Sequence, residues 1–250
     1  MDLSTVTQAS LIGVAFFAGL LSSIAGSGGI LTLPALLWAG LPPLSALATN
    51  KVQSSIGTLS SAWNFFRQGQ IDIKPLLPVL LMGFIGSVVG TLAVQQLDSE
   101  ILLKLIPFLL IAIALYFVLM PKASEATPQP KISQAWFACT AGLGMGFYGG
   151  FFGPAMGSIF PFLLVWLVAR NLVTATAETK LMILVVNGTS ALIFIAGGHV
   201  VWGLAIGMSI AQMIGARLGS NLVMKRGSSF VQPIIITVTL LMAIKLLFFA

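Results

Sequence analysis

Charged side chains are scarce in this sequence. Only 7% of its 250 residues are charged and 58% are hydrophobic, whereas a soluble domain typically carries about 25% charged residues. So few charges cannot cover a water-facing surface, and the composition therefore predicts an integral membrane protein. The positive balance, 12 Lys and Arg against 6 Asp and Glu, fits the excess of basic residues in cytoplasmic loops, and no basic run indicates nucleic-acid binding.

Residues for metal binding and redox chemistry are equally rare. The chain has one cysteine, Cys139, and one histidine, His199. A lone cysteine excludes an internal disulfide and a Cys-x-x-Cys pair, and a transition-metal centre needs several nitrogen or sulfur ligands. The sequence also shows no Ser-His-Asp set, no clustered carboxylates and no Walker-type phosphate loop. We therefore expect a protein that is not an enzyme and that has no metal or cofactor.

Apolar segments fill most of the chain. A helix needs about 20 apolar residues to cross a bilayer core of about 30 Å. Five apolar segments precede a polar, proline-containing stretch and five follow it, at 9–25, 30–40, 52–66, 75–96, 101–120, 135–147, 155–169, 181–197, 201–222 and 230–249. We predict an all-α membrane protein with one integrated domain, made of a first transmembrane repeat (1–120), a linker (121–134) and a second repeat (135–250). The short segment 30–40 would span only about 16 Å, which predicts broken or half-helices.

The two halves are related in sequence. Lys51 and Lys180 stand 129 residues apart, and the same spacing joins many small and aromatic residues of the two halves. These pairs include Gly28–Gly157, Ala46–Ala175, Ala48–Ala177, Ser61–Ser190, Ala62–Ala191, Phe65–Phe194, Gly69–Gly198, Gly86–Gly215 and Gly90–Gly219. Glycine and alanine recur in any membrane helix, but lysine is scarce here. The pattern indicates a duplication, which is the usual build of secondary transporters.

The basic residues predict the orientation of the halves. Five crossings per half would place one large group of basic residues on one side, namely Arg67, Lys74, Lys122, Lys131, Arg170, Lys225 and Arg226, and would leave Lys104 and Lys245 towards the other. Four crossings per half would divide them almost evenly. Since basic residues favour the cytoplasm, we predict five crossings, inverted repeats, a cytoplasmic linker and two periplasmic termini.

Each half has a glycine cluster between a long apolar segment and a short one. The clusters are Gly26, Ser27, Gly28 and Gly29 in the first half, and Gly149, Gly150, Gly153 and Pro154 in the second. Glycine permits the positive φ of a sharp break, and Pro154 suits the first turn of a following helix. A helix that begins inside the membrane directs free N–H groups and its positive dipole end inward, and such breaks form anion sites in transporters. Close helix packing is the other use of glycine, but the duplicated break favours the anion site.

Polar side chains gather in a helical segment of each half. They are Thr49, Asn50, Lys51, Gln53 and Ser54 in the first, and Glu178, Thr179, Lys180 and Asn187 in the second. If the first of these helices begins near Pro43, Lys51 lies about 12 Å along it. An ionisable residue at that depth indicates a functional site, while the alternative is a lysine that snorkels to the interface. We predict that the two lysines supply charge to an anion and that the neighbouring polar side chains orient it.

Glu178 is the only carboxylate in these polar segments. A carboxylate within a membrane can carry a proton, which predicts proton coupling. It can equally be a structural partner of Lys180 or Arg217, and the sequence leaves both interpretations open.

These motifs resemble the sulfite exporter TauE/SafE family, over nearly the whole chain. The first-half stretch consists of Gly26, Gly28, Gly29, Pro34, Gly40, Leu41, Pro42, Ala48-Thr49-Asn50-Lys51 and Gln53-Ser54. The second-half stretch consists of Tyr148 to Pro154, Ala177, Thr179-Lys180, Asn187 and Ala191. The sequence departs from the family's pattern at two places. The pattern at the first break reads Gly-x-Gly-Gly-Gly, but here Gly28-Gly29 is flanked by Ser27 and Ile30. At the second break, Pro154 is followed by Ala155 where glycine is expected.

The resemblance implies a multi-pass permease of the bacterial inner membrane for sulfite, sulfonates or a related small organic anion. It also implies export driven by the proton gradient, and we expect alternating access at the repeat interface. A passive anion channel and an uptake permease for a non-sulfur carboxylate are the alternatives. The expected partners are a small anionic substrate and the lipid bilayer, with no nucleic acid, and the chain is expected to be a monomer or a homodimer.

Overall fold

The computed structural model describes residues 3–25, 28–119, 129–222 and 225, and every regular element within these ranges is a helix. Three of the described helices are long and apolar enough to cross a membrane: Thr5–Ser23, Ile73–Gln95 and Leu172–Ala196. Large hydrophobic side chains also point outward, such as Phe108 (71% exposed) and Leu192 (70%). An all-helical integral membrane protein is therefore confirmed.

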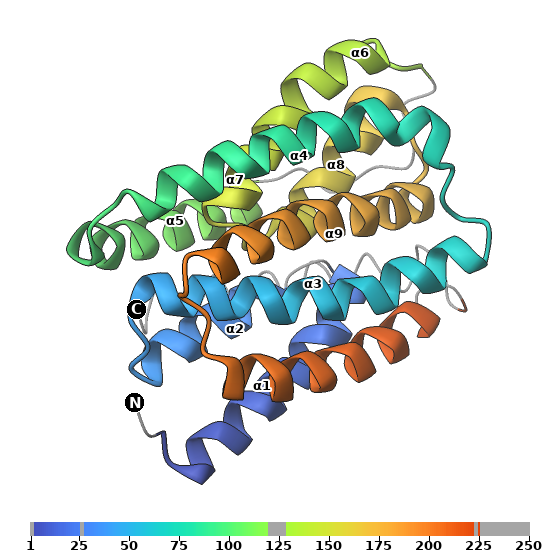
Figure 1. Ribbon diagram of the computed structural model, residues 1–250. Helices are drawn as coiled ribbons and strands as arrows, with labels where there is room; N and C mark the ends of the chain where they lie inside the picture. The colour runs from blue at the N-terminus through green and yellow to red at the C-terminus, as the bar shows by residue number, and fades with distance from the viewer. Residues whose placement is uncertain (1–2, 26–27, 120–128, 223–224, 226–250) are drawn as a thin grey trace.

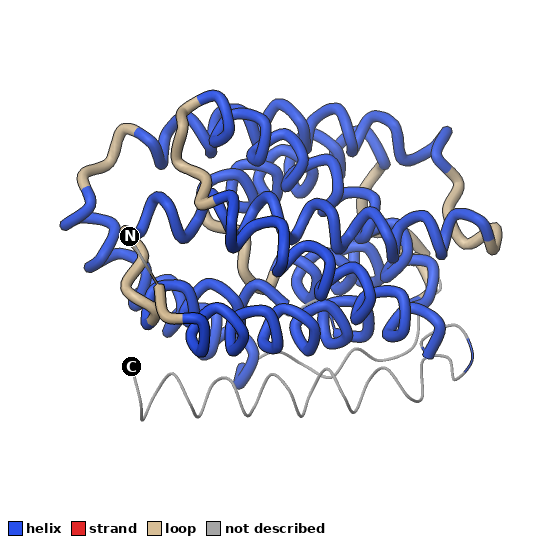
Figure 2. Tube along the Cα trace, turned by 60° about the horizontal axis from the view of Figure 1, so that its bottom comes forward, coloured by secondary structure: helices blue, strands red, loops and turns tan. Residues whose placement is uncertain are grey.

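The helices form one bundle (Figures 1 and 2). The first half contains α1 (Thr5–Ala25), α2 (Gly28–Trp38), α3 (Pro43–Arg67), α4 (Ile73–Gln95) and α5 (Ser99–Leu119). In the second half α6 (Gln134–Phe137), the π-helical turn η1 (Ala138–Gly142) and α7 (Leu143–Phe151) follow one another directly, before α8 (Met156–Val168), α9 (Leu172–Ala196) and a helix over 202–222. The apolar segments 52–66 and 181–197 miss the first nine residues of α3 and α9, because a polar stretch, 49–51 or 178–180, ends those nine residues in each helix.

The 129-residue spacing relates the two halves in structure as well as in sequence. Helices α3 and α9 are both 25 residues long, and both their starts and their ends stand 129 residues apart. Each helix is followed by a glycine in the left-handed region, Gly69 with φ 70° and Gly198 with φ 71°. The paired residues therefore occupy equivalent places in two similar stretches of backbone.

Helices α3 and α9 lie against each other and run in opposite directions (Figure 1). Lys51, early in α3, contacts Asn187, late in α9, and Thr49 contacts Val201 beyond the end of α9. A two-fold axis perpendicular to a helix pair relates antiparallel helices, whereas an axis along the bundle relates parallel ones. This pairing is what an inverted repeat requires, while inversion across a membrane stays a prediction.

Glycines let each half pack tightly on the other. A Cβ on Gly86 of α4 would lie 2.3 Å from the carbonyl oxygen of Leu143 in α7. A Cβ on Gly215 would lie 2.0 Å from the carbonyl oxygen of Phe16 in α1. At both contacts only glycine allows the backbones to approach so closely. The first long helix of each half is thus held against a later helix of the other half.

The short helix after each break runs back toward the end of the bundle at which the preceding long helix begins. The backbone N–H groups of Lys131 and Ile132, before α6, donate to the carbonyl oxygen of Leu167 near the end of α8, at 2.9 and 3.3 Å. With 13 residues, α8 is about 20 Å long, less than the bilayer core of about 30 Å. Helix α2 has only 11 residues. Both breaks therefore lie within the bundle.

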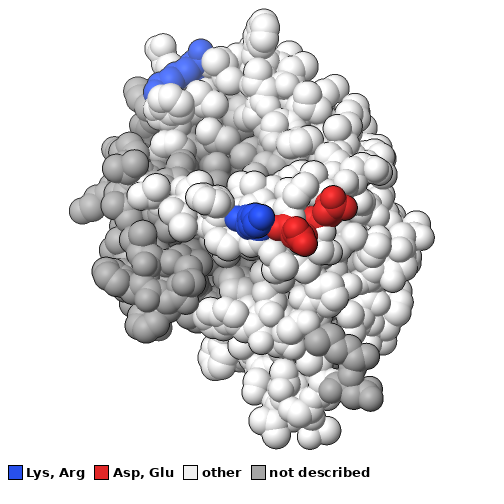
Figure 3. Space-filling view, turned by 90° about the vertical axis from the view of Figure 1, so that its left-hand side faces the viewer, with Lys and Arg blue, Asp and Glu red and all other residues white. Residues whose placement is uncertain are grey.

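The loops divide between the two ends of the bundle as five crossings per half require. Arg67, Lys74, Lys131 and Arg170 lie in or beside the loops at one end, and Gln134 Nε2 there donates to the carbonyl oxygen of Pro75. Lys104 lies near the opposite end, in the second turn of α5. Figure 3 shows that opposite end as largely uncharged: one small group of acidic and basic side chains lies near the middle of the view, and a further basic patch lies at its upper left edge. Which end faces the cytoplasm stays a prediction, and residues 121–128 of the linker lie outside the described residues.

Candidate functional site

Each of the two buried lysines crosses from its own half to the broken helix of the other. Lys51 of α3 is 1% exposed, and its Nζ donates to the carbonyl oxygen of Gly149 in the last turn of α7 and to Asn187 Oδ1 at 3.2 Å. Lys180 of α9 is also 1% exposed and donates to the carbonyl oxygen of Ser22 in the last turn of α1. The last carbonyl groups of a helix have no partner within it and carry its negative dipole end. The lysines therefore cap the two broken helices.

Neither lysine has a carboxylate partner among the described residues, where the one ion pair joins Arg170 and Glu178. Backbone and amide carbonyls are weaker partners for an ammonium group than a carboxylate, because they carry only partial charge. An anion that reached either ammonium would thus meet no competing negative side chain.

A small cavity lies beside Lys51, where the two breaks meet. Its lining includes Asn50, Lys51, Ser54 and Asn187, together with Gly29 in the first turn of α2 and Gly157 in the first turn of α8. A Cβ on Gly29 would lie 3.5 Å from Pro154 Cα, so the breaks are in contact. The cavity measures about 30 Å³, room for no more than a few water-sized groups. Two positive helix ends and one ammonium thus surround a small polar space.

The backbone conformation of the second break, between α7 and α8, explains why small residues occupy it. Gly153 has φ 100°, and a Cβ there would lie 2.6 Å from Lys51 Nζ. Ala155 has φ 65°, a left-handed conformation that favours glycine, and it is the N-cap of α8. The glycine that the family resemblance led us to expect at this position therefore has a physical reason. Pro154 precedes this N-cap, so its expected place in the first turn of the helix is wrong by two residues.

Asn50 links the cavity to the start of α2. Its Oδ1 accepts hydrogen bonds from Thr32 Oγ1 at 2.6 Å and from Gln53 Nε2 at 3.2 Å. Because the oxygen is used twice, the amide nitrogen is the part of Asn50 that can donate into the cavity. Gln53 thus orients Asn50 and does not itself line the space.

Several predicted site residues have structural contacts in this conformation. Thr49 Oγ1 accepts from the N–H of Val201 at 3.1 Å, and Thr179 Oγ1 donates to the carbonyl of Ala175 in its own helix at 2.6 Å. Gly28 packs on α1 and Gly150 packs on α4, where a Cβ would lie 2.4 Å from the carbonyl oxygen of Ser87. These two glycines serve close packing, the alternative that the sequence left open. Gly26 and Ser27 lie outside the described residues.

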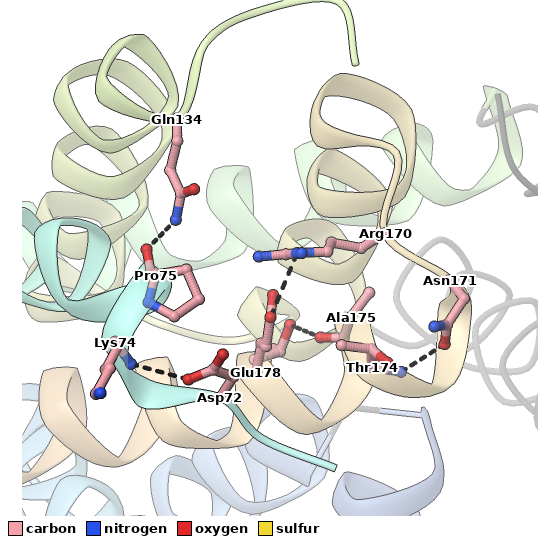
Figure 4. A network of polar contacts seen from close by, with 10 residues as sticks. Asp72, Lys74, Pro75, Gln134, Arg170, Asn171, Thr174, Ala175 and Glu178 are labelled. Carbon is pink, nitrogen blue, oxygen red and sulfur yellow. Dashed lines mark hydrogen bonds and ion pairs between the residues drawn. The ribbon is translucent and has the colours of Figure 1, made fainter. Parts of the chain in front are cut away.

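Glu178 lies apart from the cavity, in a polar cluster at the end where the basic loops gather (Figure 4). Its side chain is 2% exposed, and Oε1 lies 3.3 Å from Nε of Arg170 in the loop between α8 and α9. A structural ion pair was one of the two interpretations that the sequence left open, but its partner is Arg170 and not Lys180 or Arg217. Residues i and i+2 leave a helix on opposite sides, so Glu178 and Lys180 point apart. Arg170 was missed as a partner because a loop residue has no periodic signal.

Known proteins resemble this chain over nearly its whole length. The family model described as "Sulfite exporter TauE/SafE" matches residues 11–246. The chain belongs to the TauE/SafE family. Among its relatives, "Probable membrane transporter protein YfcA" of Escherichia coli (strain K12) is 43% identical over 242 residues, covering 95% of this chain and 90% of the relative.

Two further relatives carry similar names. A "Probable membrane transporter protein" of Haemophilus influenzae is 36% identical over 248 residues, which is 99% of this chain and 97% of the relative. "Probable membrane transporter protein ORF9" of Sinorhizobium sp is 38% identical over 246 residues, which is 98% and 94% of the two chains. No solved structure matches the chain. The protein is therefore a membrane transporter of the TauE/SafE family, with relatives that are named as transporters and not as enzymes.

Proposed function

We propose that this transporter carries sulfite, a sulfonate or a related small organic anion across the inner membrane by alternating access, as a proton-coupled exporter. The observation that carries the proposal is the buried Lys51 ammonium at a cavity where α2 and α8 begin. Each helix N-terminus contributes the equivalent of about half a positive charge. The cavity thus favours a small anion and disfavours a cation.

An oxyanion matches the hydrogen-bonding groups of the cavity. The ammonium of Lys51 and the amide nitrogens of Asn50 and Asn187 are donors, and the oxygens of sulfite or a sulfonate are acceptors only. Ser54 adds a hydroxyl group to the lining. Charge-assisted hydrogen bonds of this kind are the stronger ones. The small volume of the cavity favours a compact anion over a bulky one.

Binding at Lys51 would also act on the other half of the protein. The ammonium donates to Gly149 in α7, so an anion that takes over this donor releases the last turn of that broken helix. Substrate binding in α3 thereby changes the contact between the halves. A carrier that moves by alternating access needs a link of this kind between occupancy and conformation.

A transport assay with purified protein in liposomes tests the proposal. We expect saturable flux of labelled sulfite or a sulfonate, loss of flux in Lys51→Met, and normal flux in the control Lys104→Met at an end of the bundle. Normal flux in Lys51→Met contradicts the site. Preference for a non-sulfur carboxylate contradicts the substrate class, and single-channel currents would show a passive anion channel.

Proton coupling through Glu178 is the finer part of the proposal. The carboxylate is buried, and its Oε2 has no hydrogen-bond partner among the described residues. Glu178→Gln should lower flux driven by an imposed pH gradient, while exchange without a gradient continues. Glu100→Gln, at the exposed start of α5, is the control. Gradient-driven flux that is unchanged in Glu178→Gln removes this residue from the coupling step.

A further inference from the structure

Helix α3 and the helix over 202–222 lie side by side and run in the same direction (Figure 1). Their inner sides are in close contact, since a Cβ on Gly57 would lie 2.5 Å from Cγ of Gln212. Farther along, Asn64 Nδ2 donates to Ser220 Oγ at 2.7 Å and to Asn221 Oδ1 at 2.8 Å. These contacts close the base of a groove that opens outward between the two helices.

The groove has an apolar body and a basic end. Its volume is about 760 Å³, which is in the usual range of ligand sites. Apolar side chains of both helices line the body: Ile56, Leu59, Trp63, Met213, Ile214 and Leu218. Arg67 and Arg217 line the groove where the two helices approach their C-terminal ends.

The two arginines face the groove without a negative partner in the described part of the chain, where Arg170 and Glu178 form the ion pair. Two like charges beside one groove repel each other unless an anion lies between them. An arginine on a membrane helix is also costly without such a partner. A guanidinium group binds phosphate through two parallel hydrogen bonds, so a phosphate group satisfies both requirements.

We propose that this groove binds one anionic membrane phospholipid, with its phosphate between Arg67 and Arg217 and an acyl chain along the apolar body. A free phosphate ion would leave the apolar body unfilled, whereas a phospholipid matches both parts of the groove. Trp63 lies one turn before Arg67, where the amphipathic indole ring suits the level of lipid headgroups. The basic loops gather at the same end, as is typical of surfaces that meet anionic lipids.

This site is separate from the cavity at Lys51. Residues 50, 51, 54 and 58 of α3 line that cavity, while residues 56, 59, 60, 63 and 67 line the groove. The lipid proposal therefore does not depend on which anion is transported.

Native mass spectrometry of the full chain in detergent tests the proposal. The probes are phosphatidylglycerol, phosphatidylcholine with the same acyl chains, and glycerol phosphate. We expect selective retention of phosphatidylglycerol. Its affinity should fall about thirtyfold in Arg67→Gln/Arg217→Gln, which is the combined contribution of two basic side chains to binding an anionic lipid. Lys104→Gln is the charge control and should retain the lipid.

A second pair of variants tests the apolar body. Leu218→Trp should fill the groove and weaken retention of phosphatidylglycerol, while Leu192→Trp, on a lipid-facing side of α9, should not. Unchanged retention in the double arginine variant would overturn the proposal. So would equal binding of glycerol phosphate, which would indicate a free-anion site, or loss of a dimer without loss of lipid, which would indicate an interface with a second copy.

Discussion

Replacing Gly153 with alanine tests the site without removing any of its polar groups. The new Cβ would lie 2.6 Å from Lys51 Nζ and 3.0 Å from the carbonyl oxygen of Gly149, whereas ordinary contact begins at 3.4 Å. The ammonium must therefore move by roughly 0.8 Å, the difference between 3.4 and 2.6 Å. Because the added methyl group would crowd both the ammonium and the carbonyl oxygen, this displacement disturbs the hydrogen bond that joins them.

The expected loss in anion affinity and the expected loss in stability are of similar size. A hydrogen bond from a charged donor contributes about 1.5–3 kcal/mol, so a displaced ammonium should weaken anion affinity by about 10- to 100-fold. The left-handed backbone at φ 100° adds strain of about 1–3 kcal/mol for any residue other than glycine. The contact with Lys51 itself adds little, since it involves the end of a flexible side chain.

Gly198→Ala is the matched control. Gly198 also has a positive φ, 71°, but a Cβ there meets nothing within 4 Å. Both variants should lose similar thermal stability in detergent, and only Gly153→Ala should lose anion affinity, measured by calorimetry and by flux in liposomes. Equal affinity in the two variants would refute the role that we assign to the Lys51 ammonium.

Two further predictions concern packing and topology. Gly146→Ala should lower the unfolding temperature by roughly 5 °C, the result of overpacking by about 1–3 kcal/mol, because its Cβ would lie 2.4 Å from a backbone oxygen of α4. Gly144→Ala, two residues away with open space around it, should not lower it. In a Cys139→Ala background, cysteine at Ser4 should react with an impermeant reagent outside intact spheroplasts, and cysteine at Ser133 should not; the reverse pattern contradicts the predicted orientation.

Much of the architecture could be predicted because it follows local rules. A residue spacing of 129 revealed the correspondence of α3 and α9, since equivalent helices need similar side chains at equivalent positions. Scarce lysines made Lys51 and Lys180 conspicuous, and the structure does bury both. Helix starts were harder to predict, because the polar stretches 49–51 of α3 and 178–180 of α9 separate the first turns of each helix from its apolar segment.

The partners of the lysines could not be predicted. Lys51 donates to a backbone carbonyl 98 residues away and Lys180 to one 158 residues away. Every residue has a carbonyl group, so such an acceptor leaves no mark in the sequence. The partner of Glu178 was missed for a related reason, because Arg170 reaches it from a loop and not from a periodic helix face.

The strength of the contacts between the halves bears on how the transporter can move. In two places, between α4 and α7 and between α1 and the helix over 202–222, backbones approach so closely that a single methyl group would clash. Interfaces packed to this density change only in discrete steps. Moving one whole half against the other would separate both interfaces at once. The lysine caps, by contrast, are single side-chain contacts on the last turns of α7 and α1, directly before the breaks that lead into α8 and α2. Two units therefore stay intact, α4 with α7 and α1 with the helix over 202–222, and each combines helices from both halves. We expect α2 and α8 to shift relative to these units when the bound anion competes for the lysine ammonium groups.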